Sequence, residues 1–207
     1  MVKLGVIVTA ATITVLTAEL LSRRKRPLPA YGWMGLVALV CAEWLMFRGV
    51  EPVATYFTPI AWTAYILIAD AALFAMRGRS FLRGAPRELG RMALLSIPLW
   101  LIFEAYNLRL VNWTYVGLPA NPVARWLGYA WSFATITPAI LLTAELVESF
   151  GWFSRPRRPV QFSPAAERGM IVSGAALLVI PLAFPAPSGL ICLASYGWDS
   201  SCSWTRS

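Results

Sequence analysis

The chain has 207 residues, of which 58% are hydrophobic and only 14% are charged, a balance that excludes an ordinary soluble domain. Its mean hydropathy is +0.61. Histidine is absent, which excludes histidine-ligated haem, the usual zinc sites and a Ser-His-Asp triad. The composition therefore predicts an all-α polytopic membrane helical bundle, with no metal site and no cofactor.

Apolar segments long enough to cross a bilayer recur along the chain. A spanning helix needs roughly 20 apolar residues, so a chain of this length holds about six of them. We expect one transmembrane helical domain over residues 1–187. The predicted spans are residues 4–21, 31–48, 53–76, 92–108, 126–147 and 169–185.

Basic residues are concentrated in every second connection between these spans. They follow the first, third and fifth spans, and the formal charge of the chain is +8. The positive-inside rule then places the N-terminus outside the cytoplasm. The first span could instead be a cleaved signal peptide, but Lys3 alone precedes it while four basic residues follow it, which is the reverse of a secretory signal.

The same distribution bears on partners and location. Because topology explains the positive charge, nucleic acid is not an expected partner. We expect a multi-pass protein of the cytoplasmic (inner) membrane, whose main partner is the lipid bilayer. Association as a homo-oligomer or with other membrane subunits is compatible with the sequence.

Each of the last four spans contains one proline, which removes a backbone donor and favours a kink. Neighbouring helices or threonine side chains such as Thr58 and Thr137 can restore the missing hydrogen bonds. Among the cysteines, Cys41 is expected in helix packing. The prolines are Pro59, Pro98, Pro138 and Pro181.

Acidic residues occur within or at the edges of the spans, where a carboxylate is costly unless it has a partner or reaches water. Glu19 and Arg23 are one helical turn apart, which predicts an ion pair. Asp70 and Glu145 lie within two turns of basic loops, so either snorkelling to water or a function explains them. Glu43 and Glu104 lie deeper, near the predicted external side.

Two segments on the external side share a pattern. The second span ends with Glu43-Trp-Leu-Met-Phe-Arg48 and the fourth ends with Glu104-Ala-Tyr-Asn-Leu-Arg109. The returning spans also agree, with AWTA at 61–64 and AWSF at 130–133. The pattern indicates either repeated helical hairpins, whose interface is a common place for binding sites, or coincidence.

We predict that Glu104 is buried against another helix, within reach of Arg48 or Asn107, and that Trp113 and Tyr115 lie at headgroup level. The alternative is an interfacial belt of aromatic and charged anchors. The candidate binding residues are Glu43, Arg48, Glu104, Asn107, Arg109, Asn112, Trp113 and Tyr115.

FEAYNLRLVNWTYVGLP, residues 103–119, resembles a Glu-x-x-Asn…Trp-x-Tyr…Pro motif of a family of uncharacterised prokaryotic polytopic membrane proteins. More distantly, an acid followed after eight residues by Trp-x-Tyr is similar to the repeat of integral-membrane lycopene cyclases. That resemblance would place Glu104, Trp113 and Tyr115 at the motif positions. The cyclase pattern continues with Pro-x-Glu-Glu, whereas Pro119 is followed here by Ala-Asn-Pro.

The last residues, 188–207, form an irregular tail that lacks the periodicity of a helix or a strand. Reading YGWDSSCSWTR from the third base of its codons permits WLGFVLLLDPL, a membrane-like segment. The tail is therefore either a frameshift product beginning near Pro187 or a natural irregular end.

Three functions are compatible with this sequence. The first is a non-enzymatic membrane module that binds a small solute, an ion or a proton near the external face. The second is a membrane enzyme acting on an isoprenoid or another lipid-soluble substrate, with Glu104 as general acid and aromatic faces stabilising a cation. The third is a structural scaffold or subunit.

Overall fold

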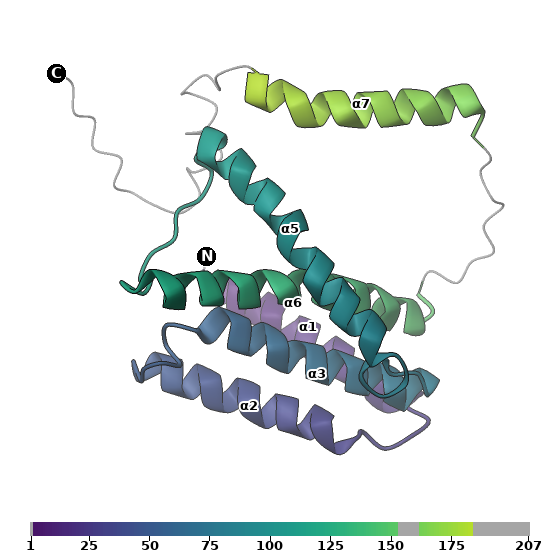
Figure 1. The fold of residues 1–207 in the computed structure, drawn as a ribbon. Helices are drawn as coiled ribbons and strands as arrows, with labels where there is room; N and C mark the ends of the chain where they lie inside the picture. Colours follow the sequence, from purple (N-terminus) through teal and green to yellow (C-terminus); the bar gives the residue numbers. More distant parts are fainter. Residues whose placement is uncertain (1, 153–161, 184–207) are drawn as a thin grey trace. The chain divides into compact units, whose positions relative to one another are not determined.

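The computed structural model describes residues 2–152 and 162–183, and that part of the chain contains seven helices and no strand. The all-α class is thereby confirmed. The predicted tail at 188–207 lies outside the described residues. In chain order (Figure 1) the helices are α1 (Val2–Arg23), α2 (Ala30–Phe47), α3 (Phe57–Arg77), α4 (Phe81–Gly84), α5 (Pro86–Leu110), α6 (Pro122–Ser149) and α7 (Pro164–Ala183).

Five of these helices, α1, α2, α3, α5 and α6, are long and apolar enough to cross a membrane. They coincide with the first five predicted spans. The sixth predicted span falls largely on α7, which is helical but is not among the five within the described residues. The count of about six spans therefore stays a prediction.

The chain divides into two compact units. The first, called here the bundle unit, comprises residues 1–100 and 117–156; the second unit comprises residues 101–116 and 157–207. The boundary falls within α5. Within the second unit, the Tyr106 hydroxyl donates to the Leu178 carbonyl of α7 at 2.9 Å.

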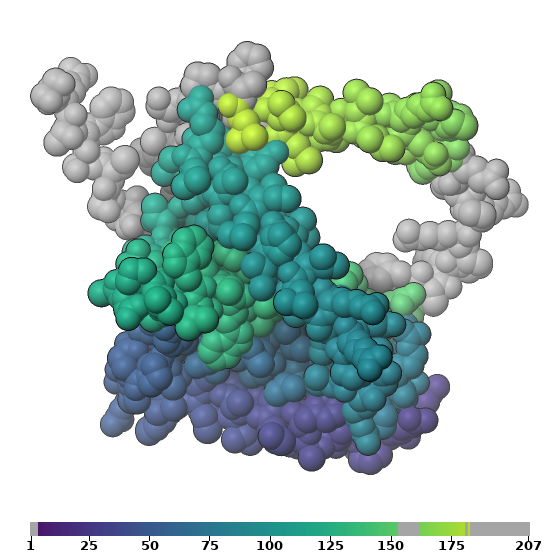
Figure 2. All heavy atoms as spheres, viewed as in Figure 1, coloured from purple at the N-terminus to yellow at the C-terminus, as the bar shows by residue number. Residues whose placement is uncertain are grey.

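Helix α3 is the centre of the bundle unit, and it lies beside both α2 and α6 (Figure 1). More than half of its most apolar stretch is buried, 56%, whereas the corresponding value for α1 is 0%. Figure 2 shows the side chains of α2 and α3 filling the space between the two helices. The buried core shared by α3 and α6 consists of Ile66, Ala69, Leu73, Ala139 and Leu142.

Small residues allow α2 and α3 to approach closely. Gly32 and Gly35 of α2 are buried. A Cβ atom at Gly32 would lie 2.4 Å from the Cβ of Ala71, and one at Gly35 would lie 2.8 Å from the carbonyl oxygen of Ala64. Since apolar burial alone does not drive helices together in lipid, this close packing is a main source of α2–α3 association.

Polar side chains join α3 to α6. The Tyr65 hydroxyl and the Thr143 hydroxyl are 2.6 Å apart, and the Trp131 indole donates to the Thr63 hydroxyl at 3.0 Å. The second contact brings together the AWTA and AWSF segments that the sequence pattern matched.

Cys41, expected in helix packing, is instead exposed on α2.

A buried serine reaches from α5 into the backbone of α6, next to a proline. The hydroxyl of Ser96 donates to the Phe133 carbonyl at 2.5 Å and accepts from the Thr137 amide at 3.0 Å. In a regular α-helix that carbonyl and that amide bond to each other. The sequence predicted that neighbouring helices or threonine side chains restore hydrogen bonds lost at the prolines. Pro138 lacks the donor for the Ala134 carbonyl, so the bond that Ser96 bridges is the one immediately before it.

Large apolar side chains are exposed along most of the long helices. Examples are Ile7 on α1, Val37 on α2, Leu94 on α5 and Leu177 on α7, all at least 60% exposed. Soluble proteins rarely expose apolar surface on this scale, whereas lipid-facing helices do so routinely. The faces indicate contact with the hydrocarbon of a bilayer.

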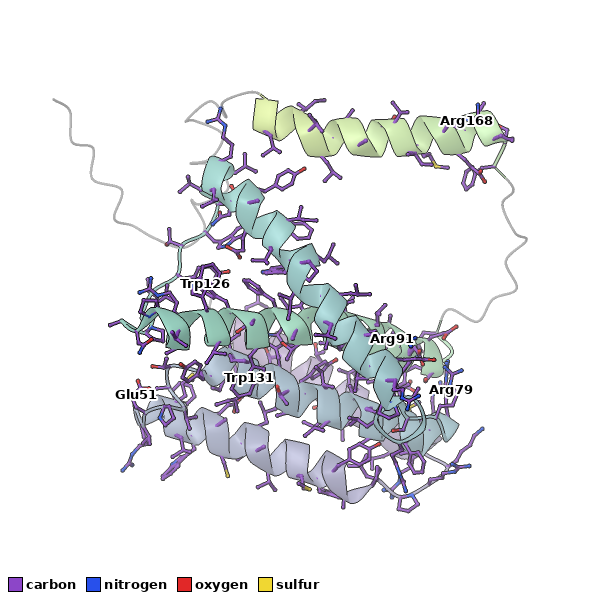
Figure 3. All side chains as sticks on the ribbon, in the orientation of Figure 1. Glu51, Arg79, Arg91, Trp126, Trp131 and Arg168 are labelled. Carbon is purple, nitrogen blue, oxygen red and sulfur yellow. The ribbon has the colours of Figure 1, made fainter. Side chains whose placement is uncertain are left out.

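Two of the connections rich in basic residues, those that follow α1 and α3, meet at one end of the bundle unit, called here the basic end. The amides of Lys25 and Arg26 donate to the Ala75 carbonyl near the end of α3 at 2.8 and 3.1 Å. Figure 3 shows Arg79 at this end and Glu51 at the other. The expected ion pair between Glu19 and Arg23, also near this end, is confirmed.

Candidate functional site

A carboxylate is completely buried close to the basic end. Asp70, on α3, has 0% exposure. One oxygen, Oδ2, accepts from the Tyr31 hydroxyl at 2.8 Å and from the Ser80 hydroxyl at 2.5 Å. The other, Oδ1, accepts from the backbone amides of Phe81 at 2.6 Å and Leu82 at 3.4 Å. Each oxygen therefore has two donors, which offsets the cost of burying it.

Local sequence explains how these donors reach Asp70. Gly78 ends α3 with a φ of +73°, a left-handed conformation that glycine adopts without strain, and its amide donates to the Phe74 carbonyl. The chain then turns back, and Ser80 caps α4 by accepting from the Arg83 amide at 3.0 Å. Asp70 thus fixes a whole loop, and the interpretation that its carboxylate snorkels to water is wrong.

A pocket of about 450 Å³ adjoins this loop. It is formed by the end of α3, the short helix α4, the start of α5 and the last turns of α6, all in the bundle unit. The residues lining it are Leu73, Phe74, Gly78, Arg79, Ser80, Phe81, Arg83, Gly84, Ala85, Glu88 and Glu145.

Charges of both signs line this pocket. Arg79 donates to Glu145 at 3.3 Å, with the carboxylate mostly buried and the guanidinium mostly exposed. Arg83 lies over the ring of Phe74, 4.8 Å from its centre. Glu88 also lines the cavity and is exposed. Such a lining offers hydrogen-bond donors and acceptors to a polar ligand.

Some of the residues predicted on the external side belong to the second unit. Glu104 is half-buried and accepts from the Tyr115 hydroxyl at 2.6 Å. Asn107 accepts from the amides of Asn112 at 2.9 Å and Trp113 at 3.1 Å, and it donates to the Trp113 carbonyl at 2.8 Å. The structure therefore brings Glu104 to Tyr115, whereas the sequence favoured Arg48 or Asn107.

The end of α5 explains this local fold. Val111 has a φ of +51°, a left-handed conformation that is unfavourable for a β-branched residue. It turns the chain back so that Trp113 lies beside Asn107. The three hydrogen bonds of Asn107 hold the reversed segment in place.

Three further predicted site residues are exposed. Glu43 and Arg48 belong to the bundle unit, and the Arg48 guanidinium lies over the Trp44 ring at 5.4 Å. Arg109 belongs to the second unit. The predicted proximity of Glu104 to Arg48 remains a prediction.

The pocket at the basic end was missed by the sequence analysis. Ten of its eleven lining residues lie between positions 73 and 88, and only Glu145 comes from a distant part of the chain. The stretch 73–88 contains no recognised ligand-binding motif. One signal was present: a glycine followed by a serine, Gly78 and Ser80, is typical of a helix stop and a new helix cap. It predicts the turn but not the acid that holds the turn.

Comparisons of the chain with models of protein families, with curated proteins and with solved structures gave no match. The class of protein therefore rests on its own helices. Five long apolar helices and their exposed apolar faces indicate a multi-pass helical membrane protein.

Proposed function

We propose that this membrane protein binds a small solute with groups of both charge signs in the pocket at the basic end. The observation that carries this proposal is the lining, in which Arg79 and Arg83 share one cavity with Glu88 and Glu145. Its volume of about 450 Å³ is within the roughly 300–1,000 Å³ of small-molecule sites. The proposed function is binding without catalysis, as in the first of the three functions compatible with the sequence. The proposed site is the pocket at the basic end, whereas the sequence analysis placed it near the external face.

The mixed lining favours a zwitterion over a simple ion. An anion would be attracted by the two arginines and repelled by the two carboxylates. A cation would be attracted by the carboxylates and repelled by the arginines. A zwitterion can pair with both kinds of group. It would exchange the Arg79–Glu145 ion pair, whose guanidinium is mostly exposed and which is worth about 1 kcal/mol or less, for two charge-assisted hydrogen bonds of its own.

The proposal includes an orientation. The basic end carries the arginines that the positive-inside rule assigns to the cytoplasm. The protein would lie in the cytoplasmic membrane, and the solute would enter from the cytoplasmic side.

Binding of zwitterions to the purified protein in lipid nanodiscs tests this function. Calorimetric titration would use phosphoethanolamine and a set of free amino acids, with inorganic phosphate and an alkylammonium ion as probes of single charge. We expect saturable binding of at least one zwitterion. Arg79→Gln and Glu145→Gln should each weaken it about tenfold, a loss of about 1.4 kcal/mol.

Arg87→Gln is the matched control, because Arg87 is an exposed arginine near the pocket that does not line it. It should bind as the unmodified protein does. Equally tight binding of phosphate or alkylammonium, or full binding by both pocket variants, would contradict the proposal.

A second candidate function concerns Glu104, and the Glu104–Tyr115 hydrogen bond of 2.6 Å favours it. The bond joins the acid and the aromatic residue of the motif. We propose two uses of this carboxylate: it binds an ion, a proton or a small solute, or it acts as the general acid of a lycopene cyclase-like enzyme on an isoprenoid.

Glu104→Gln separates these two uses. If the residue binds a proton or solute, the variant in proteoliposomes should lose a change in internal pH or solute content that the unmodified protein produces. If it is a general acid, expression of the unmodified protein in a carotenoid-producing host should alter the extracted lipids, and the variant should not. No response in either assay would leave the scaffold hypothesis in their place.

A further inference from the structure

We infer that the segment between α1 and α2 is a binding site for the phosphate group of an anionic phospholipid. The site is a second, smaller cavity at the basic end, which shares no lining residue with the solute pocket. Its volume is about 330 Å³, and it is lined by Arg24, Lys25, Arg26 and Pro27. Three of these four residues are cations, and no carboxylate lines the cavity.

Backbone hydrogen bonds tie this segment to α1 and α3. The Arg24 amide continues the hydrogen bonding of α1 by donating to the Leu20 carbonyl at 2.9 Å. The next two amides, of Lys25 and Arg26, both donate to the Ala75 carbonyl of α3. A segment fixed at both ends of the basic run loses little backbone entropy when a ligand binds.

The Arg26 side chain is also positioned in advance. Its guanidinium lies over the Phe74 ring, 5.4 Å from the centre. It occupies space that a side chain at position 78 would need, since a Cβ atom on Gly78 would lie 2.5 Å from Arg26 Nη1. The absence of a side chain at Gly78 therefore leaves room for this arginine beside the cavity.

The cations of the cavity have no acidic partner among the described residues. Arg23, just outside the cavity, is neutralised by Glu19. The ion pairs found in the described part of the chain include none with Arg24, Lys25 or Arg26. Their charge is therefore available to an external anion, and guanidinium groups bind phosphate through paired hydrogen bonds.

The depth of the cavity in the membrane indicates that the anion is a lipid phosphate. The cavity begins one residue after α1, a helix with the length and composition of a span. It is tied to Ala75, two residues before the end of another such helix. This level corresponds to the boundary between hydrocarbon and water, where lipid phosphates are concentrated, and basic clusters at that level attract anionic lipids.

Retention of lipid by the purified protein tests this inference. The protein in a neutral detergent would be titrated with phosphatidylglycerol and, separately, with phosphatidylcholine, and bound lipid would be counted by native mass spectrometry. Inorganic phosphate and glycerol phosphate would be added as competitors. We expect the protein to prefer phosphatidylglycerol. The double variant Arg24→Gln/Lys25→Gln should bind this lipid about tenfold more weakly or worse.

The control is Arg87→Gln/Arg91→Gln, which removes the same charge from exposed positions at the start of α5. It should retain the lipid. If the double variant does not fold, Lys25→Gln alone should still weaken binding about fivefold.

Three results would overturn the inference. They are equal affinity for the two lipids, equal losses in the test and control variants, and displacement of the lipid by inorganic phosphate at similar concentration. The last would identify a site for a free anion. None of these measurements depends on the solute pocket, so the inference and the proposed function fail separately.

Discussion

Replacing Asp70 by alanine is expected to lower the free energy of unfolding by about 3 to 5 kcal/mol. The substitution removes the acceptor of the Tyr31 and Ser80 hydroxyls and of the Phe81 amide. Each buried donor left without a partner costs about 1–3 kcal/mol. The three donors are only partly buried, so the expected loss is smaller than three full penalties. Reversible unfolding in mixed micelles measures the loss.

Asp70→Asn should cost clearly less. Its carbonyl oxygen still accepts from the Phe81 amide, and the two hydroxyls can rotate to accept from its amide group. Glu88→Ala, which removes an exposed carboxylate at the same end, should change stability by less than about 0.5 kcal/mol. If Asp70→Ala is as stable as Glu88→Ala, the buried network does not hold the loop.

The second large effect is expected at the α2–α3 contact. Gly35→Ala would place a Cβ atom 2.8 Å from the Ala64 carbonyl oxygen and 2.9 Å from the Leu67 Cβ. Both neighbours are close to the backbone and cannot rotate away, so α2 must move outward. Overpacking of this kind costs about 1–3 kcal/mol, and Gly32→Ala should add to the loss.

Gly90→Ala is the matched control because it lies in α5 with no atom within 4 Å of the new Cβ. It should leave stability unchanged or raise it by up to about 1 kcal/mol, since glycine is unfavourable inside a helix. The same unfolding measurement compares the three variants. If Gly35→Ala is as stable as Gly90→Ala, the close packing of α2 on α3 does not contribute to the fold.

Much of the fold follows from local patterns. Runs of apolar residues predict the five long helices, and a spacing of four residues predicts the Glu19–Arg23 pair. Both depend only on neighbours along the chain. The orientation in the membrane and the number of spans remain predictions, because they depend on the bilayer and on residues outside the described part.

The candidate sites depend on contacts that local patterns do not contain. Asp70 is near a basic loop in sequence, which suggested a path to water, but Tyr31 from another helix covers it. Glu104 meets Tyr115 only because the chain reverses at Val111, a residue type that seldom adopts a left-handed conformation. Neither the covering helix nor the reversal has a sequence signal strong enough to predict.

Two of the polar contacts between helices, Tyr31 with Asp70 and Ser96 with α6, differ in what their loss would leave behind. If Tyr31 leaves Asp70, the buried carboxylate loses one of its four donors. If Ser96 leaves α6, the Phe133 carbonyl and the Thr137 amide can bond directly to each other, as in any regular helix. Loss of the first contact therefore leaves a buried carboxylate short of a donor, whereas loss of the second leaves the backbone groups of α6 able to satisfy each other.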